Sequence, residues 1–158
     1  MSATSTGAQD VSAGILPDDP QALAELTAQT MYAHDQASQA LGAQVVSVAP
    51  GKAGMSMTVR SDMLNGHKTC HGGFIFALAD SAFAFACNSR NAVTVASGCT
   101  IDFLAPAFEG DVLTAHADEY SLAGRTGVYD VHVSKQDGTR IAIFRGRSYR
   151  IKGQVVET

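Results

Sequence analysis

The apolar positions between Gln21 and Leu41 recur at about the 3.6-residue period of a helix, so this segment is predicted to be helical. Asp18 or Asp19 is placed to cap the helix, and Pro20 suits its first turn because proline has no N–H to leave unbonded. The residues that set the period are Leu23, Leu26, Ala28, Met31, Tyr32 and Ala33.

Six short segments bounded by turn signals are predicted to be β-strands. Pro50-Gly51 separates the first two, which therefore resemble a hairpin, and Asp137-Gly138 is a strong hairpin signal between the last two. The polar stretch Ser61–His71 is predicted to be a loop. The predicted strands are Ala43–Ala49, Ala53–Arg60, Val93–Leu104, Asp111–Ala123, Gly127–Gln136 and Arg140–Lys152.

The segment Gly72–Asn88, with the sequence GGFIFALADSAFAFACN, is apolar on every face. Its five alanines favour a helix over a strand, and a helix that is apolar all round is buried. It is too short to cross a bilayer, which takes roughly 20 apolar residues. Because the connections between strands are short, we expect an antiparallel sheet. The predicted fold class is therefore α+β, with one strongly curved antiparallel sheet wrapped around a long central helix.

Asp80 stands in the middle of this apolar helix, where an ionised carboxylate is costly unless it is paired or hydrogen-bonded. The segment between Gly72 and Ser89 contains no Lys or Arg, so no partner lies at helical spacing. Two interpretations follow. Asp80 either lies at a small solvated edge or beside a distant Arg, or it is a catalytic acid, base or nucleophile in a pocket.

Gly72 and Gly73 stand at the start of the same helix. The first N–H groups of a helix have no internal partner, so both glycines could donate to a developing oxyanion, although an ordinary loop-to-helix turn also uses glycine. Asp80 follows Gly72 by eight residues, which is about 12 Å along a helix. One carbonyl carbon cannot touch both groups. If both are catalytic, a second copy must complete the site in an obligate dimer.

Length and composition fit one intracellular domain. With 158 residues, 46% of them hydrophobic, the chain can bury a core without disulfides. The cysteines Cys70, Cys87 and Cys99 form no C-x-x-C pair, which excludes a disulfide framework and a four-thiolate zinc site and indicates a reducing, cytoplasmic location. Residues 1–20 are predicted to be a disordered tail without the features of a secretory signal, and residues 21–158 to be the domain.

Charge and spacing narrow the remaining classes of site. The net charge of −4 argues against a nucleic-acid partner, yet seven of the eleven basic residues follow position 124 and could bind an anionic small ligand or form a solvated strand face. His67, Cys70 and His71 could suit a metal only if Asp80, Asp62 or another residue completed the site, so no metal is expected. Cys70 with a histidine is a further candidate, as a nucleophile.

The run NGHKTCHGGFIFALADSAFAFACNSRN resembles the signature of the hot-dog-fold acyl-CoA thioesterases of the phenylacetate-degradation (PaaI) type. The segments CTIDFLAPAFEGDVLTA, RTGVYDVHV and FRGRSYRI resemble the strands that follow it, and the likeness covers roughly Gln21–Lys152. The resemblance implies a hot-dog fold and dimers with a continuous sheet that pair into tetramers. It also implies hydrolysis of acyl-CoA, with aromatic acyl groups such as phenylacetyl or hydroxyphenylacetyl favoured and with no cofactor.

The resemblance further implies roles for particular residues. Asp80 matches the catalytic carboxylate, as base or nucleophile, and Gly72 matches the backbone donor to the thioester carbonyl, the two coming from opposite subunits in the family. Asn65 matches a residue that positions water or substrate, and His71 a neighbouring site residue. The alternatives are a hot-dog dehydratase or hydratase with an Asp–His pair, and a non-catalytic acyl-CoA binder. Further contacts to the substrate, including the CoA phosphates, are expected from Gly73, Ser97, Arg125, Arg145 and Arg147.

Overall fold

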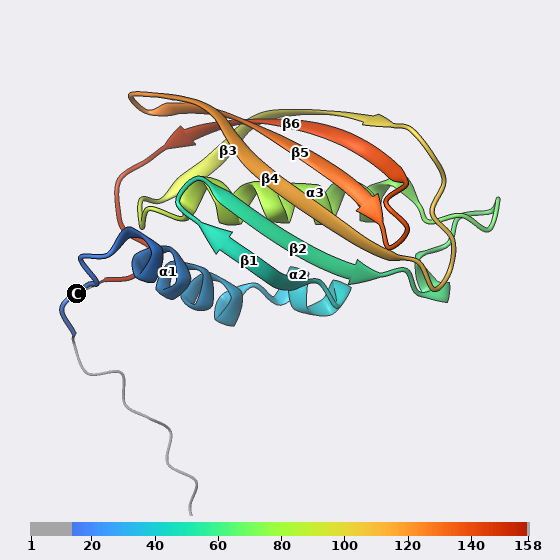
Figure 1. Cartoon of the computed structure of the whole chain (residues 1–158), viewed down its shortest axis with the longest axis horizontal. Coiled ribbons are helices and arrows are strands. Elements are labelled where there is room, and N and C mark those ends of the chain that lie inside the picture. The colour runs from blue at the N-terminus through green and yellow to red at the C-terminus, as the bar shows by residue number, and fades with distance from the viewer. Residues whose placement is uncertain (1–13, 158) are drawn as a thin grey trace, which may run out of the picture.

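The computed structural model of the protein describes residues 14–157, in the order helices, hairpin, central helix and four strands (Figure 1). Of the tail expected over residues 1–20, the first 13 lie outside the described residues, and residues 14–19 contain no helix or strand. The predicted order of a helix, two strands, a buried helix and four strands is confirmed apart from a break in the first helix, and no strand end differs by more than two residues from the one expected.

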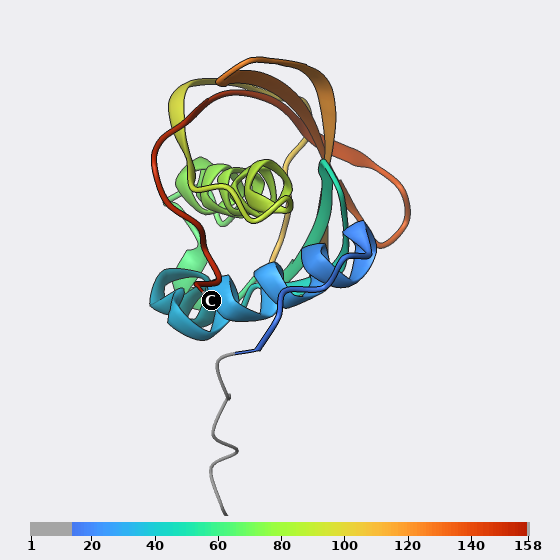
Figure 2. The ribbon, with the colours of Figure 1, turned by 90° about the vertical axis from the view of Figure 1, so that its left-hand side faces the viewer.

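Six antiparallel strands form one sheet in the order β1-β2-β4-β5-β6-β3, and this sheet curls around the central helix α3 (Gly72–Asn88) (Figure 2). The predicted curved sheet around a long helix is therefore confirmed. Strand β3 follows α3 in the chain but lies at the far edge of the sheet, where it pairs only with β6. The strands are β1 (Gln44–Ala49), β2 (Lys52–Thr58), β3 (Thr94–Phe103), β4 (Val112–Ala123), β5 (Thr126–Lys135) and β6 (Arg140–Arg150).

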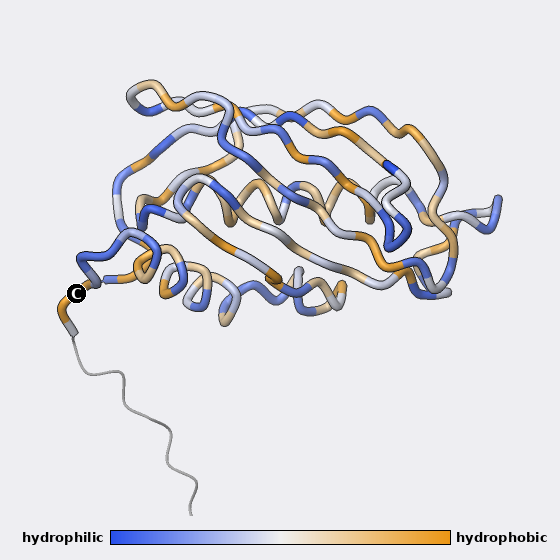
Figure 3. Tube along the Cα trace, viewed as in Figure 1, coloured by the Kyte–Doolittle hydropathy of each residue, from blue (hydrophilic) through white to orange (hydrophobic). Residues whose placement is uncertain are grey.

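The core lies between the concave face of the sheet and α3. Apolar and polar residues alternate along β4, β5 and β6 because one face of each strand packs inward and the other meets solvent (Figure 3). The ring of Phe83 on α3 lies between Tyr129 and Phe144, at centroid distances of 5.5 and 5.9 Å. Gly146 makes room for this ring, since a Cβ there would stand 2.7 Å from two of its carbons. The packing of Phe83 thus fixes how deeply α3 sits.

The N-terminal helix is interrupted, which corrects the prediction of one helix over residues 21–41. Helix α1 (Pro20–His34) begins at Asp19, whose carboxylate accepts from the Ala22 N–H at 2.9 Å, and α2 (Gln36–Leu41) begins at Asp35. The Asp35 backbone leaves the helical region, with φ −87° and ψ 79°, and its carboxylate accepts from the Ser38 N–H at 2.9 Å. The hydrogen bond from the Ser38 N–H to the Asp35 side chain therefore replaces the continuous helix with a break at this residue.

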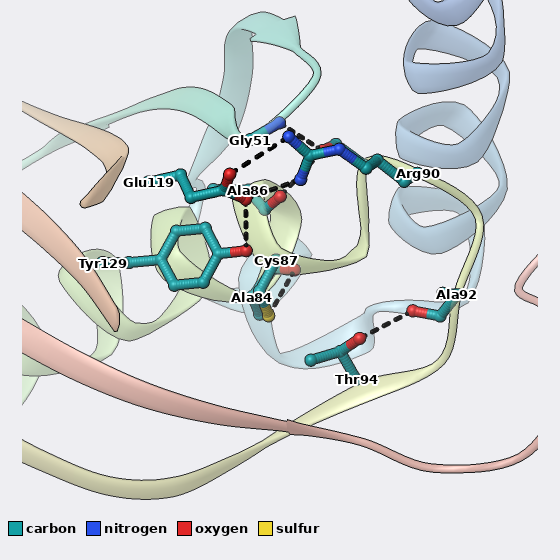
Figure 4. Close-up of polar contacts among 10 residues, drawn as sticks. Gly51, Ala84, Ala86, Cys87, Arg90, Ala92, Thr94, Glu119 and Tyr129 are labelled. Atoms are coloured by element: carbon teal, nitrogen blue, oxygen red, sulfur yellow. Dashed lines mark hydrogen bonds and ion pairs between the residues drawn. The ribbon is translucent and has the colours of Figure 1, made fainter. Parts of the chain in front are cut away.

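A polar network anchors the C-terminal end of α3 to the sheet (Figure 4). The Arg90 guanidinium pairs with the Glu119 carboxylate of β4, and the same carboxylate accepts from the Tyr129 hydroxyl at 2.9 Å. The Gly51 N–H in the β1–β2 turn donates to the Ser89 hydroxyl at 2.8 Å. These contacts hold one end of the helix in place, so that its other end can present a site in a fixed position.

Candidate active site

The N-terminus of α3 is built around His71. Its N–H donates to the Met63 carbonyl at 2.8 Å, its Nδ1 accepts from the Gly73 N–H at 2.9 Å, and its carbonyl accepts from the Phe74 N–H at 3.0 Å. Within residues 14–157, the Gly72 N–H has no acceptor. The position of both glycines at the helix start made both candidate donors, and the family resemblance assigned the role to Gly72. The structure ties the Gly73 N–H to His71, so Gly72 carries the free donor.

An apolar cleft of about 400 Å³ opens beside this free N–H. The ring of Phe103, at the end of β3, lies against Gly72, because a Cβ there would come within 2.9 Å of the ring Cζ. Phe103 and Leu104 are 53% and 52% exposed, so two neighbouring large apolar side chains lie open at this cleft. The residues that line the cleft are Thr69, Cys70, Gly72, Ile75, Phe103, Leu104, Ala105 and Pro106.

Asn65 organises the loop that leads into the cleft. Its side-chain oxygen accepts from the His67 N–H at 2.9 Å and the Thr69 N–H at 3.3 Å, while its amide nitrogen donates to the Thr69 hydroxyl at 3.1 Å. The residue expected to position water or substrate thus also shapes its own loop. The isolated bridge between Leu64 and Cys70 closes the same loop.

Asp80 is half-buried on α3, and no hydrogen bond or ion pair reaches its carboxylate from the described residues. Burial raises the pKa of this carboxyl above its ordinary value. Burial also raises the pKa of the Cys99 thiol on β3, and the negative charge of Asp80 adds to that rise. The charge of Asp80 is therefore felt at the edge strand β3.

Ser97 lies in a bulge on β3, between Ala96 and Gly98, and its hydroxyl donates to the Arg147 carbonyl at 3.1 Å. Bulges re-aim side chains next to active sites, so an exposed hydroxyl here could reach a ligand along the edge strand. The structure brings Ser97 and Arg147 together but gives neither a contact with Gly72.

The three arginines expected at the CoA phosphates differ in whether a carboxylate already binds their guanidinium group. Arg145 is committed to Asp130, at 2.6 and 2.7 Å, and its guanidinium lies 5.1 Å from the centre of the Tyr120 ring. Arg147 covers Gly98, and Arg125 lies in the β4–β5 turn; neither has a carboxylate partner in the described part of the chain. Register places Asp130 opposite Arg145, which the sequence pattern could not reveal.

Two other kinds of site were considered from the sequence, a cysteine nucleophile at Cys70 and a metal site. Cys70 is buried, and its thiol lies 3.7 Å from the His71 carbonyl, while burial raises its pKa. Within residues 14–157, no three His, Cys, Asp or Glu side chains come close enough together to hold a metal ion. None of the helices in this described range is long and apolar enough to cross a membrane.

Comparisons with known proteins identify the family. Residues 67–142 match the family model of the thioesterase superfamily. The chain is 50% identical over 128 residues to the Escherichia coli acyl-coenzyme A thioesterase PaaI, an alignment that covers 81% of this chain and 91% of the relative. This chain belongs to the acyl-CoA thioesterases of the PaaI type.

Solved structures agree with this membership. The Escherichia coli PaaI protein from the phenylacetic acid degradation operon superposes with a TM-score of 0.85 at 48% identity, over 86% of this chain and 99% of that one. A mutant of the phenylacetic acid degradation protein PaaI from Thermus thermophilus gives a TM-score of 0.70 at 43% identity, over 72% and 97% of the two chains. The family resemblance, the hot-dog fold and the thioesterase class predicted from sequence are confirmed.

Proposed function

We propose that this thioesterase hydrolyses aromatic acyl-CoA at a site that two chains share. The observation that carries the proposal is that the Gly72 N–H, at the positive end of α3 and beside an apolar cleft, has no acceptor among the residues that the structure describes. The carboxylate of Asp80, which has no partner in the described part of the chain, lies about 12 Å further along the same helix. Two α3 helices that run antiparallel across a dimer would bring Gly72 of one chain to Asp80 of the partner subunit, with the exposed edge strand β3 as the pairing surface.

The reaction needs one donor and one carboxylate. The Gly72 N–H binds the thioester oxygen and stabilises the negative charge that grows there, as helix N-termini do for anions. Asp80 takes a proton from water, whose oxygen bonds to the carbonyl carbon, and the carbon–sulfur bond then breaks to release the CoA thiol, which takes up a proton. In the other route the carboxylate attacks the carbonyl carbon, and the carbon–sulfur bond breaks to release the CoA thiol, which takes up a proton. Water then hydrolyses the resulting mixed anhydride to the free acid and the Asp80 carboxylate. The raised pKa of Asp80 suits a base better than an unperturbed carboxyl would.

The aromatic preference is supported by the cleft and by the relatives. Phe103 forms an aromatic wall of the cleft and Ile75 also lines it, so a flat apolar acyl group would find aromatic and aliphatic contacts next to the Gly72 N–H. The two related structures are described as proteins of phenylacetic acid degradation. A substrate panel tests this point: phenylacetyl-CoA should exceed butyryl-CoA in kcat/KM, and Phe103→Ala should narrow that ratio. Equal rates for both substrates would contradict the aromatic assignment.

Proline at position 72 tests the donor directly. Gly72 is the first residue of α3, where proline is tolerated, and His71 has φ −61° and ψ 132°, the extended conformation that proline requires of its predecessor. Gly72→Pro therefore deletes the N–H with little damage to the helix. Gly72→Ala is the matched control, because it also adds a Cβ against Phe103 but keeps the N–H. We expect kcat to be about 10²- to 10³-fold lower for Pro than for Ala, and equal values would remove Gly72 from the mechanism.

Mixing inactive chains tests the shared site. A dimer of one Gly72→Pro chain and one Asp80→Asn chain contains one site with both changes and one site with neither. Random exchange makes about half the dimers mixed, so about a quarter of the wild-type turnover should return. If each chain held a complete site, mixing would restore nothing. Release of free thiol in the wild-type assay also separates hydrolysis from the dehydratase and binder alternatives.

A further inference from the structure

Histidine is an unusual helix N-cap, and His71 caps α3 through Nδ1. The residues that usually cap helices are Ser, Thr, Asp and Asn, whose oxygens accept from the first N–H groups. A histidine can do so only when Nδ1 carries no proton, which places the remaining proton on Nε2. The hydrogen bond from Gly73 therefore assigns His71 as the neutral Nε2–H tautomer.

The position of the ring is fixed by a second contact, which also accounts for Gly73. A Cβ on Gly73 would stand 3.1 Å from His71 Nδ1 and 3.5 Å from Cε1, so the imidazole lies against the bare Cα of this residue. The ring also meets Phe74 edge-on, with centroids 6.3 Å apart at 80°. The imidazole thus contacts two residues of the turn that it caps.

This arrangement determines which N–H groups face a substrate. An uncapped first turn would leave the N–H groups of both Gly72 and Gly73 unbonded, and the turn would fray. With Gly73 bound to His71, Gly72 keeps an N–H without an acceptor among residues 14–157, and the capped helix sets its direction. Aspartate would cap the helix as well, but it would place a negative charge beside an oxygen that becomes negative in the reaction. The neutral imidazole avoids that repulsion.

We infer that His71 is a positioning residue for the hydrolysis, which locks the first turn of α3 so that Gly72 presents a single N–H to the thioester oxygen. The inference rests on the proposed role of Gly72. It assigns His71 no proton transfer, and it thereby distinguishes this site from one with an Asp–His pair. Any uncharged side chain that caps the helix at this position should serve equally well, so an imidazole is not required.

Three substitutions separate positioning from stability. His71→Ala removes the cap, His71→Ser restores a neutral cap, and His71→Asp restores a charged one. With phenylacetyl-CoA we expect kcat to fall roughly 10- to 100-fold in His71→Ala, with little change in KM, and to return close to wild type in His71→Ser. His71→Asp should be as thermally stable as His71→Ser while its kcat stays low. Asp19→Ala, which removes the equivalent cap of α1, should lower Tm without lowering kcat.

Hydrogen exchange at the Gly73 amide gives a readout that does not depend on turnover. This amide should exchange slowly in the wild type and in His71→Ser, and fast in His71→Ala. Unchanged kcat in His71→Ala, a serine variant as slow as the alanine variant, or an aspartate variant as active as the serine variant would each overturn the inference. An inactive wild type that still protects Gly73 would instead contradict the proposed function, together with the positioning role built on it.

Discussion

Replacement of Asp80 by asparagine should stabilise the fold at neutral pH while it removes most of the turnover. The carboxylate is half-buried on α3 and has no hydrogen-bond or ion-pair partner among the described residues. Asparagine has nearly the same shape and carries no charge, so the change removes the cost of burying that charge and little else. Stability and activity are therefore expected to move in opposite directions, as they do when a functional group is kept at the expense of the fold.

The pH dependence of this gain has a definite sign. Burial raises the pKa of Asp80, so the folded chain holds this proton more tightly than the unfolded chain does. The contribution of the group to stability is thus complete below its unfolded pKa of about 3.9, and it is lost as the pH rises through the raised folded value. The asparagine side chain of the variant does not titrate. The advantage of Asp80→Asn should consequently be absent in acid, grow across that window and stay constant above it.

The size of the effect follows from the degree of burial. A buried polar group without a partner costs about 1–3 kcal/mol, and a half-buried one belongs at the lower end, at about 1 kcal/mol. In a chain of 158 residues that corresponds to a gain of about 2–4 °C in Tm. Loss of a general base lowers kcat by about 10²- to 10⁴-fold, which is about 3–5 kcal/mol of barrier.

Thermal unfolding followed by circular dichroism, at one protein concentration and a series of pH values, measures the difference. Asp62→Asn is the control of opposite sign, because hydrogen bonds from Arg60 lower the pKa of the exposed Asp62 carboxyl, so this variant should gain nothing at neutral pH. The reasoning is refuted if Asp80→Asn melts at or below the wild-type temperature near pH 7. It is refuted equally if the gain persists at the lowest pH at which both proteins stay folded.

Two further changes test the packing and the charge assignments. Gly146→Ala would press a methyl group onto the buried ring of Phe83 and should lower the free energy of unfolding, measured in urea, by about 1–3 kcal/mol. Gly66→Ala is the control, because a Cβ there meets nothing within 4 Å and should not cause this loss. Equal urea midpoints for the two variants would show that Phe83 can move aside. Arg147→Ala should raise KM for acyl-CoA and weaken its salt dependence, while Arg145→Ala, whose guanidinium already binds Asp130, should change KM little. A larger KM effect at Arg145 would reverse that assignment.

The central helix could be predicted from sequence because every signal in it agrees. Gly72–Asn88 is continuously apolar, rich in alanine and preceded by a polar loop, and the observed helix has the predicted bounds. The prediction of a single N-terminal helix was wrong because two local signals disagree there. Its apolar period runs through Asp35 without a break, but the Asp35 carboxylate binds the Ser38 N–H and hydroxyl and starts a second helix. Periodicity reports burial, and it does not detect a side chain that competes for the backbone.

The candidate site was only partly predictable, because its selectivity comes from contacts between distant residues. Spacing alone indicated that Gly72 and Asp80 are too far apart for one chain, since that argument needs only the rise of a helix. The pairing of Arg145 with Asp130 depends on the register of β5 with β6, for which the sequence gives no signal. Sequence analysis did not identify Phe103 as a wall of the cleft. It reaches the cleft from the end of β3, and only the folded chain brings it next to Gly72.

The adjacent glycines at the helix start show why a motif alone underdetermines a site. Gly72 lacks a side chain because the ring of Phe103 occupies that space, and Gly73 lacks one because the ring of His71 does. The first contact shapes the cleft in which a substrate would lie, and the second holds the hydrogen bond that removes Gly73 as a donor. Two glycines that look interchangeable in sequence therefore serve separate parts of the chemistry. Gly72 makes room for the ring of Phe103 and keeps an N–H without an acceptor in the described part of the chain. Gly73 makes room for the ring of His71, which caps the helix without binding the Gly72 N–H.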